Sequence, residues 1–256
     1  MDFKNIALKA ATDAGEKLRS LFNTDLKHHK KGKNDIVTEA DFAAEKIILD
    51  LIKKHFPSHN TISEEAGIEK NNSDYTWIID PLDGTVNYTQ GIEEYAVSIA
   101  LSHNDKIIIG VIYRPESNEI FFAEKGKGAF KNNKKIIVST ESHLEDMMIS
   151  TDNSLQEPAR SHIFQTLNYI RDNFRHVRIF GSSSLHLCRI ANGQMDFHYK
   201  HQYNHWDFAA GKIIVEEAGG KATDLLGNPI TKDSQSILAS NGIRHKEILE
   251  MINKKY

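Results

Sequence analysis

The sequence contains few cysteines and prolines: one cysteine, Cys188, and five prolines among 256 residues. A single cysteine cannot form an internal disulfide and fits a reducing compartment, so we expect a cytoplasmic protein. Cys188 lies in an apolar segment with helical spacing, which favours a buried, inert thiol over a nucleophile. The chain is nevertheless long enough to bury a hydrophobic core without cross-links.

Long hydrophobic runs and a strong charge excess are also absent. The N-terminus is charged and amphipathic without a signal-peptide core, and no apolar run approaches the roughly 20 residues that span a bilayer. The formal net charge is -3, so the chain has no global basic field that would hold nucleic acid or an anionic membrane. We therefore expect a soluble protein that binds neither nucleic acid nor a membrane.

The chain lacks the usual motifs of zinc-binding proteins, serine hydrolases and dinucleotide-binding proteins. The thirteen histidines include no pair with convincing zinc-ligand spacing to cysteine or carboxylate partners. The chain has no Gly-x-Ser-x-Gly segment, which weakens the case for a serine hydrolase. Residues 126–130 resemble the start of a glycine-rich dinucleotide loop, but the third glycine and the following helix are missing, so we expect a hairpin or bulge turn there.

The most informative segment is Trp-Ile-Ile-Asp-Pro-Leu-Asp-Gly-Thr-Val-Asn-Tyr at residues 77–88. Its β-branched start predicts a short buried strand, which should end at Asp80 because Pro81 cannot donate to a β-ladder. Asp80 and Asp83 would then lie in the turn beyond the strand, at the edge where ligands bind in open α/β sheets. Two carboxylates beside the N–H groups of the next Gly-Thr pair would repel an anion unless cations lay between them. We therefore interpret this segment as a divalent-metal and phosphate site.

A common Asp-Pro-x-Asp-Gly turn is the simpler explanation of this segment, but acidic residues elsewhere favour the metal site. Glu64 and Glu65 follow another predicted strand near residue 62. If this strand neighbours the one that starts at Trp77, Glu64 and Asp80 could bind one ion together. Oxygen ligands of this kind suit Mg²⁺, or Mn²⁺ as a substitute, rather than zinc.

Hydrophobic periodicity predicts helices and strands along the whole chain. The predicted helices cover residues 2–22, 38–55, 159–171, 185–191, 206–218 and 243–253. The predicted strands lie near residue 62 and at 77–79, 95–101, 106–113, 119–124, 136–138, 147–151, 177–180, 195–199, 221–223 and 236–239. Residues 27–34 are predicted to form an exposed basic loop, and residues 131–135 a turn. The polar segment 139–145 suggests a boundary, so we expect an N-terminal α+β subdomain at 1–140 that carries most metal ligands and a C-terminal α/β subdomain at 141–256 that closes the active site.

Further polar groups lie at predicted helix starts, where capping is the simpler explanation. Thr38 is a suitable N-cap, and Asp41 occupies the position of a capping-box acid. The turn Gly181-Ser182-Ser183 precedes another predicted helix, so it could cap that helix or hold an anion or hydroxyl groups. Asp207 could cap the helix that contains it or complement the helix dipole.

These segments together resemble both signatures of the inositol monophosphatase family. The matching segments are Glu64-Glu65, residues 77–87 and residues 206–211, in that order and with that spacing. Residues 38–41, Thr-Glu-Ala-Asp, are similar to the acidic start of the family's second helix. The resemblance spans nearly the whole chain, and the combination is much more specific than any single motif.

The resemblance implies a layered αβαβα sandwich, with an antiparallel sheet in the N-terminal half and a mixed sheet in the C-terminal half. It implies a Mg²⁺-dependent phosphomonoesterase that acts on a small phosphorylated substrate, is inhibited by Li⁺ and forms a homodimer. One Mg²⁺ would be held by Glu64, Asp80 and the Leu82 carbonyl. A second would be held by Asp80, Asp83 and Asp207, and Glu64 would contribute to a loosely bound third.

The same resemblance implies direct hydrolysis without a phosphoenzyme. Thr85, relayed by Asp41, would orient or deprotonate the attacking water, and Glu64 would be a further catalytic residue. The N–H groups of Gly84 and Thr85 would hold the phosphate. The implied substrate-binding residues are Asp83, Gly84, Thr85, Gly181, Ser182, Ser183, Lys200 and Asp207.

Substrate choice is expected to depend on Lys200. It lies seven residues before Asp207, where the family has an inositol-reading glutamate. A carboxylate accepts hydrogen bonds from sugar hydroxyls, whereas an ammonium group only donates, so Lys200 would favour a second anionic group on the substrate. The basic segment 30–33 indicates the same preference. Inositol monophosphate, the 2′-phosphate of NADP(H) and fructose 1,6-bisphosphate remain candidates, and a regulatory or RNA-associated binding module remains an alternative to an enzyme.

Overall fold

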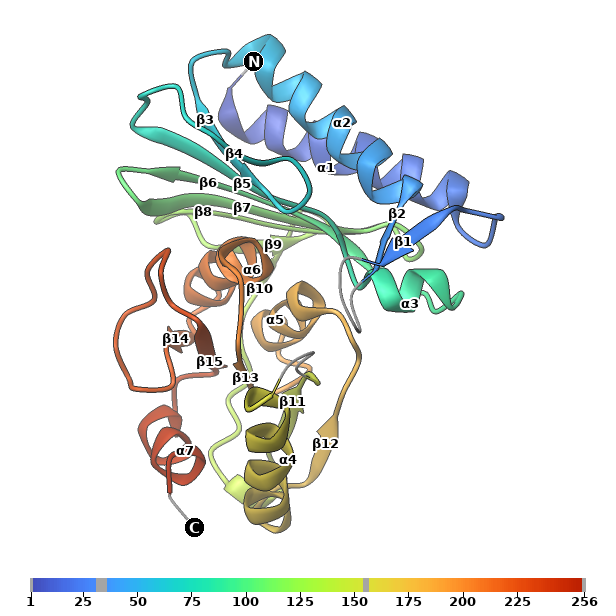
Figure 1. Cartoon of the computed structure of the whole chain (residues 1–256). Helices are drawn as coiled ribbons and strands as arrows, with labels where there is room; N and C mark the ends of the chain where they lie inside the picture. The colour runs from blue at the N-terminus through green and yellow to red at the C-terminus, as the bar shows by residue number, and fades with distance from the viewer. Residues whose placement is uncertain (1, 31–35, 154–156, 255–256) are drawn as a thin grey trace.

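The computed structural model describes residues 2–30, 36–153 and 157–254, which form alternating layers of helices and sheets (Figure 1). The α-helices of the described residues are α1 Phe3–Leu21, α2 Glu39–His55, α3 Thr85–Thr89, α4 Ala159–Ile170, α5 Ser183–Ala191, α6 His205–Glu217 and α7 His245–Ile252. Helices α1 and α2 cover the outer face of a first, eight-stranded sheet. Helices α5 and α6 lie between this sheet and a second, five-stranded sheet, whose far side is covered by α4 and α7. The expected αβαβα sandwich is confirmed.

The first sheet has the strand order β10-β9-β8-β7-β6-β5-β3-β4. Its strands are β3 Asn60–Ser63, β4 Gly67–Glu69, β5 Tyr75–Asp83, β6 Ala96–His103, β7 Lys106–Arg114, β8 Glu119–Glu124, β9 Ala129–Lys131 and β10 Lys134–Ile136. Neighbouring strands run antiparallel except β3 and β5, which run parallel. The sheet that we expected to be antiparallel thus contains one parallel pair, and this pair places the carboxyl ends of β3 and β5 side by side.

Strand β5 continues past the residue at which the sequence predicted its end. It includes Pro81 and ends at Asp83, so Asp80 and Asp83 lie on the strand itself and not in a following turn. The register of the pairing with β6 shifts between these two aspartates. A proline inside such an irregularity removes no regular ladder hydrogen bond, which explains why Pro81 does not end the strand.

Strand β10 also differs from the prediction. We expected a turn at 131–135 and a strand at 136–138, but β10 already begins at Lys134. Asn132 and Asn133 both adopt positive φ, so two residues suffice for the tight turn between β9 and β10.

The second sheet has the strand order β12-β11-β13-β15-β14. Its strands are β11 Met148–Thr151, β12 His176–Arg178, β13 Phe197–His201, β14 Lys221–Thr223 and β15 Ser236–Ser240. Strand β11 runs parallel to both of its neighbours, whereas β15 runs antiparallel to β13 and β14. The sheet is therefore mixed, as predicted.

A two-stranded ribbon, formed by β1 His28–Lys30 and β2 Ile36–Thr38, precedes α2. The sequence predicted an exposed loop over 27–34, and the pairing of His29 with Val37 corrects this for the described part. Residues 31–34, which include most of the basic segment 30–33, lie outside the described residues.

Successive residues of β5 face different layers, as the pleat of a strand requires. Trp77 and Ile79 pack in the cluster that contains α1 and α2, whereas Ile78 packs in the cluster that contains α5 and α6. Helix α6 crosses the sheet closely, because a Cβ on Gly110 of β7 would lie 2.6 Å from the Ala210 carbonyl oxygen. This close contact places α6 directly against the sheet that carries Asp80.

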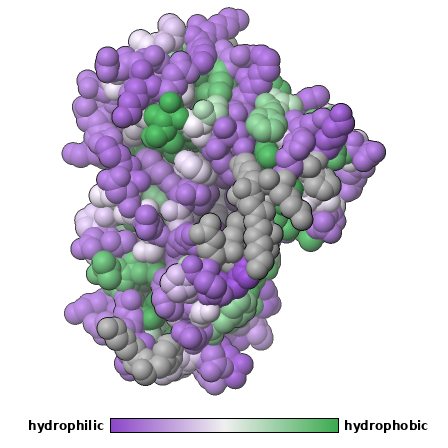
Figure 2. Space-filling view, viewed as in Figure 1, coloured by the Kyte–Doolittle hydropathy of each residue, from purple (hydrophilic) through white to green (hydrophobic). Residues whose placement is uncertain are grey.

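The surface shows no broad hydrophobic area on the face drawn in Figure 2, where hydrophobic side chains form small groups among mostly hydrophilic residues. The most exposed large hydrophobic side chains, Ile68 and Leu226, belong to different sheets or their connections. Within the described ranges, no helix is both long enough and apolar enough to cross a membrane.

Candidate active site

Two of the predicted metal ligands lie where the parallel pairing of β3 and β5 ends. Ser63 of β3 pairs with Ile79 of β5, so Glu64 and Asp80 follow the last paired residues of adjacent strands. Asp80 is 2% exposed, and the Leu82 N–H donates to its Oδ1 at 3.1 Å. The arrangement that would allow Glu64 and Asp80 to share an ion is therefore present.

An acid that the sequence analysis did not identify, Glu45 of α2, supports the segment around Glu64. Its Oε1 accepts hydrogen bonds from the Ser63 hydroxyl and from the N–H groups of Glu65 (3.2 Å) and Ala66 (2.9 Å). These donors flank Glu64, so the buried Glu45 carboxylate fixes the turn that carries it. Glu45 lies one helical turn after the predicted relay aspartate, and this spacing was the only sequence signal that could have indicated it.

Asp83 connects the first sheet to helix α5. Its Oδ2 accepts hydrogen bonds from the Ser182 hydroxyl (2.6 Å), the Ser184 N–H (2.7 Å) and the Ser184 hydroxyl. Its Oδ1 accepts one bond, from the Ser183 N–H at 3.0 Å, and keeps a lone pair for a further partner. The turn before α5 thus holds an anion, which was one of the alternatives left open by the sequence, and that anion is the Asp83 carboxylate.

Asp207 lies in the first turn of α6. Its Oδ2 accepts the N–H of Asn204 at 2.9 Å, and the two residues form a capping box. The predicted capping role of Asp207 is therefore confirmed, and it places a third carboxylate opposite β5 from the other half of the chain.

The carboxylates of this site repel one another. Burial and the negative charges of Glu64, Asp83 and Asp207 raise the pKa of Asp80 well above its ordinary value. Burial also raises the pKa of Asp207 to about 6, although the nearby charge of Lys200 opposes this. Cations neutralise a buried group of like charges, and oxygen-only donors suit Mg²⁺ or Mn²⁺. The donor set therefore fits a divalent metal.

A different acidic group lies on the surface. Among the described residues, Glu141, His143 and Asp146 form the group whose potential ligand atoms lie within 4.8 Å of one another. Glu141 Oε1 accepts hydrogen bonds from the N–H groups of Ser142 and His143, both at 2.8 Å, so a local turn explains its position. The predicted metal ligands are spaced more widely than this group in the described part of the chain.

Thr85 links the carboxylates to α2. Its hydroxyl oxygen lies 3.2 Å from Asp41 Oδ1 and 2.9 Å from the Leu82 carbonyl oxygen. The other Asp41 oxygen, Oδ2, accepts the Thr38 N–H at 2.8 Å and the Thr38 hydroxyl at 2.6 Å, which confirms the predicted capping box. Burial raises the pKa of Asp41, although the hydrogen bonds from Thr38 and Thr85 oppose this. Asp41 is thus a cap that also contacts Thr85.

Gly84 forms the junction between β5 and α3. Its φ of 93° lies in the left-handed region that favours glycine. A Cβ at this position would lie 2.7 Å from the Glu94 carbonyl oxygen and 3.4 Å from the Gly181 carbonyl oxygen. The junction therefore requires glycine, and it brings the predicted phosphate-binding N–H groups of Gly84 and Thr85 next to the turn before α5.

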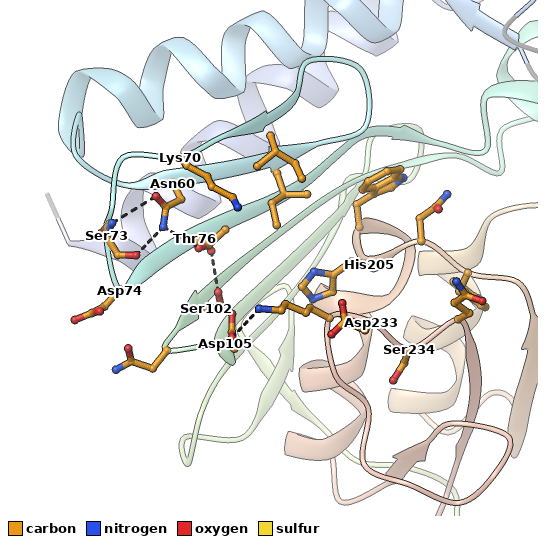
Figure 3. A pocket seen from close by; sticks show the side chains of 18 of the residues that line it. Asn60, Lys70, Ser73, Asp74, Thr76, Ser102, Asp105, His205, Asp233 and Ser234 are labelled. Carbon is orange, nitrogen blue, oxygen red and sulfur yellow. Dashed lines mark hydrogen bonds and ion pairs between the residues drawn. The ribbon is translucent and has the colours of Figure 1, made fainter.

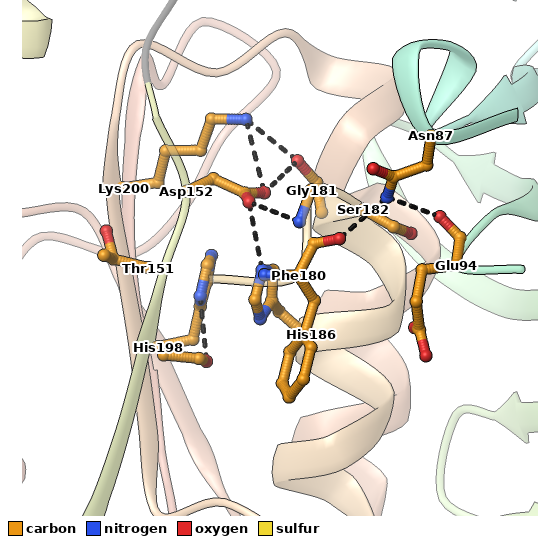
Figure 4. Close-up of polar contacts among 12 residues, drawn as sticks. Asn87, Glu94, Thr151, Asp152, Phe180, Gly181, Ser182, His186, His198 and Lys200 are labelled. Atoms are coloured by element: carbon orange, nitrogen blue, oxygen red, sulfur yellow. Dashed lines mark hydrogen bonds and ion pairs between the residues drawn. The ribbon is translucent and has the colours of Figure 1, made fainter. Parts of the chain in front are cut away.

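Lys200 is held in a network of polar contacts (Figure 4). Its Nζ donates to the Ser183 hydroxyl at 2.9 Å and lies 3.9 Å from Asp152 Oδ2. Asp152 also accepts the Gly181 N–H at 3.0 Å. The structure thus brings together three residues predicted to contact substrate, Gly181, Ser183 and Lys200, around a carboxylate that the sequence analysis missed.

A cavity of about 830 Å³ lies between the first sheet and the N-terminal residues of α6 (Figure 3). Its lining includes Trp206 but none of the predicted site residues. Charges of both signs line it, among them Lys232 and Asp105, which form an ion pair at 3.0 Å. The cavity therefore has no clear preference for an anion or a cation.

Comparison with known proteins decides the family. Residues 2–256 match the sequence model that describes the inositol monophosphatase family. The chain belongs to this family. It is 38% identical to the fructose-1,6-bisphosphatase/inositol-1-monophosphatase of Thermotoga maritima over 225 residues, which cover 88% of this chain and 85% of that protein. It is 37% identical to the Nus factor SuhB of Vibrio cholerae, covering 98% of this chain and 95% of that protein.

The fold agrees with this assignment. The crystal structure of the extragenic suppressor protein suhB from Bartonella henselae superposes with a TM-score of 0.94 at 35% identity, covering 98% of each chain. Membership of the inositol monophosphatase family supports a phosphatase, and the family resemblance noted in the sequence is confirmed. The names of the relatives also include Nus factors, so the substrate does not follow from membership alone.

Proposed function

We propose that the chain is a Mg²⁺-dependent phosphomonoesterase that hydrolyses small polyol or nucleotide phosphates. The observation that carries this proposal is the set of carboxylates on β5 and α6, because burial, together with repulsion among them, raises the pKa of Asp80 and Asp207 and so favours a bound cation. We also propose that it is a cytoplasmic homodimer, in which residues 1–140 carry most ligands and residues 141–256 close the site.

In this proposal, Glu64, Asp80, Asp83, Asp207 and the Leu82 carbonyl hold two or three Mg²⁺ ions, which Mn²⁺ could replace. When bound, such ions polarise a phosphoryl group and lower the pKa of a coordinated water. The Leu82 carbonyl oxygen lies 2.9 Å from the Thr85 hydroxyl and has two lone pairs, which remain available to an ion when that hydroxyl donates to Asp41 instead. The Asp83 Oδ1 likewise has one protein donor and room for another partner.

Thr85 and Asp41 are proposed to move the proton of the attacking water. The Thr85 hydroxyl can donate to Asp41 Oδ1, which leaves its oxygen lone pairs to accept a proton from the water. Burial raises the pKa of Asp41 and so makes this carboxylate a better proton acceptor. As water attacks phosphorus directly, the ester P–O bond breaks and the alcohol oxygen leaves and takes a proton from solvent. Asp41 then returns its proton to solvent, and no phosphoenzyme forms.

The phosphate is proposed to lie against the junction of β5 and α3. The first N–H groups of a helix have no partner within the helix, and those of Gly84 and Thr85 fall in this class. They are suited to hold phosphate oxygens as negative charge increases in the transition state. The turn of Gly181, Ser182 and Ser183 would contact the alcohol part of the substrate from the opposite side.

A regulatory binding module is the second candidate, favoured by the name of the Vibrio cholerae relative. The two candidates differ in whether the chain releases phosphate. We would measure phosphate release from inositol 1-phosphate, NADP⁺, adenosine 3′,5′-bisphosphate and fructose 1,6-bisphosphate, with and without Mg²⁺. Mg²⁺-dependent release supports the phosphatase, and Li⁺ is then expected to inhibit it. Failure to hydrolyse any of these substrates, with tight binding of a protein or RNA partner, would favour the binding module.

The stabilising effect of Mg²⁺ is expected to depend on pH. The pKa of Asp207 rises from 3.8 to about 6 on folding, so the folded state binds protons more tightly than the unfolded state. The resulting stabilisation is full below the unfolded pKa and is lost as the pH rises through the folded pKa. Mg²⁺ should therefore raise the melting temperature more at about pH 8 than at about pH 5, where protons compete with it.

This prediction is checked by thermal unfolding at both pH values with and without Mg²⁺. The Asp207→Asn variant is the control, because it cannot titrate at this position and should lose much of the pH difference. An equal effect of Mg²⁺ at both pH values in the parent protein would contradict the metal site.

Replacement of Glu45 tests the support of Glu64. Glu45→Ala removes the acceptor of three hydrogen bonds, so we expect the Mg²⁺ concentration for half-maximal activity to rise about tenfold, as for loss of an outer-shell partner. Glu45→Gln keeps an oxygen for the same donors and should stay close to the parent. If both variants need the parental Mg²⁺ concentration, Glu45 does not position Glu64.

A further inference from the structure

Asp152 is the centre of the contacts around the turn before α5. It follows β11, is 4% exposed, and accepts hydrogen bonds on both oxygens. Oδ1 accepts the Gly181 N–H at 3.0 Å and faces His186 Nε2 at 3.1 Å. Oδ2 accepts the Ser183 hydroxyl at 3.3 Å and lies 3.9 Å from Lys200 Nζ (Figure 4). The Asp152 carboxylate therefore contacts the Gly181 N–H and the Ser183 hydroxyl of the turn before α5, and it lies near the Lys200 ammonium group of β13.

Lys200 is consequently not a free cation. Its side chain is 14% exposed, donates to the Ser183 hydroxyl and lies 4.5 Å from the centre of the Tyr203 ring. Burial would raise the pKa of Asp152, but His186 and Lys200 beside it hold the pKa well below its ordinary value. The carboxylate is thus ionised at neutral pH and offsets the Lys200 charge.

Two buried histidines lie beside this pair, and one of them, His186, also contacts Asp152 at 3.1 Å. His186 stacks on His198 with ring centres 4.6 Å apart. Burial and the neighbouring His186 lower the pKa of His198 well below its ordinary value, so His198 is neutral. Its ring nitrogens face the Ser150 hydroxyl at 3.1 Å and the Tyr203 hydroxyl at 2.8 Å. Asp152 thus has two cationic or potentially cationic neighbours, and Lys200 is the one that also donates to the predicted substrate-binding residue Ser183.

We propose that Asp152 determines substrate specificity by offsetting the charge of Lys200, so that this subsite favours the hydroxyl groups of a monophosphorylated polyol over a second phosphate. The inference rests on the proposed phosphatase function and revises the expectation that Lys200 alone selects a doubly anionic substrate. The Ser183 hydroxyl, already fixed between the two charges, gives the subsite a polar group of the kind that pairs with a substrate hydroxyl.

The test compares kcat/KM for inositol 1-phosphate and fructose 1,6-bisphosphate in the presence of Mg²⁺. Asp152→Asn keeps an oxygen for the Gly181 N–H but removes the negative charge, which leaves Lys200 unpaired. We expect the ratio of the two kcat/KM values to shift about tenfold in favour of the bisphosphate, because the Lys200 charge, when it is not offset, attracts the second phosphate. Lys200→Gln removes the positive charge and keeps the negative charge of Asp152, so the preference should move about tenfold in the opposite direction.

The double variant Asp152→Asn/Lys200→Gln removes both charges and should return to within about twofold of the parental preference. Asp196→Asn is the matched control, because Asp196 is buried at the opposite end of β11, where it accepts the Met148 N–H at 2.6 Å. This control should not change the ratio, even if it lowers the melting temperature.

Different results would contradict the specificity role of Asp152 and the proposed phosphatase function. If Asp152→Asn lowers both kcat/KM values by the same factor, or if the two single variants move the ratio in the same direction, Asp152 supports structure only and the inference is wrong. The same conclusion follows if the parent itself prefers the bisphosphate by more than about tenfold. If the parent hydrolyses neither substrate, the proposed function fails, and the inference fails with it.

Discussion

Asp80→Asn is expected to lower kcat by about a thousandfold while the protein remains folded. Asparagine has nearly the same shape as aspartate, and its side-chain oxygen can still accept the Leu82 N–H. The change removes one negative charge from a position that is proposed to contact two metal ions. Because that position is 2% exposed, water cannot replace the lost charge stabilisation.

The same substitution should relieve repulsion in the absence of metal. Burial and three neighbouring carboxylates raise the pKa of Asp80, so a neutral amide is tolerated better there than the charged form. We therefore expect the metal-free Asp80→Asn variant to melt at or above the temperature of the metal-free parent. A variant that is inactive but not destabilised would separate a functional from a structural role.

The measurement is phosphate release at saturating Mg²⁺, together with thermal unfolding. Asp74→Asn is a matched control, because Asp74 is exposed and immediately precedes the other end of β5. Asp207→Asn should resemble Asp80→Asn in activity. Near-normal turnover in either site variant would contradict the assignment of these carboxylates to the metal ions.

Asp41→Asn is expected to lower kcat about a hundredfold, with a much smaller effect on KM. The proposed relay requires Asp41 Oδ1 to receive a proton through the Thr85 hydroxyl, which lies 3.2 Å away. An amide cannot accept that proton at neutral pH. Substrate binding does not use Asp41 directly, so the loss should appear in the chemical step.

Asp41 also caps α2, and its two roles need separate variants. Thr38→Ala removes the hydroxyl that accepts the Ala40 N–H at 3.1 Å and donates to Asp41 Oδ2 at 2.6 Å, so it weakens the cap by about 1 kcal/mol. The Asp41 carboxylate itself remains and still accepts the Thr38 N–H at 2.8 Å. If capping were the only role of Asp41, both variants would lose similar activity. A hundredfold loss in Asp41→Asn beside near-parental turnover in Thr38→Ala would identify the proton relay.

The sequence predicted the family, the layered fold and most of the elements, because these depend on local patterns. The short apolar, β-branched run at 77–79 predicted the strand that both core clusters share, and this is confirmed. The capping box of Asp41 was predicted for the same reason, since a cap needs only residues three apart, and capping was one of the two roles considered for Asp207. The metal-ligand and catalytic roles of these residues stay predictions.

The predictions were wrong where pairing with a neighbouring strand overrides a local sequence preference. Pro81 would end an isolated strand, but the register shift against β6 gives it a position without a ladder bond. The basic segment before α2 looked like a loop because its partner strand, β2, lies beyond a break in the pattern. Short strands carry few residues, so their pairing depends on neighbours more than on propensity.

By itself, the sequence determined which residues are predicted to carry chemistry: the carboxylates Glu64, Asp80, Asp83 and Asp207, and the Gly84-Thr85 junction. Only the tertiary structure decided which groups surround them. The contacts of Glu45 with the segment around Glu64 follow only from the structure, because they join α2 to the end of β3. The contacts of Asp152 likewise join the end of β11 to the turn before α5. The charge of Lys200 could not be judged from its position in the chain, since the field at a side chain is set by neighbours in space, and Asp152 lies 48 residues earlier in the sequence.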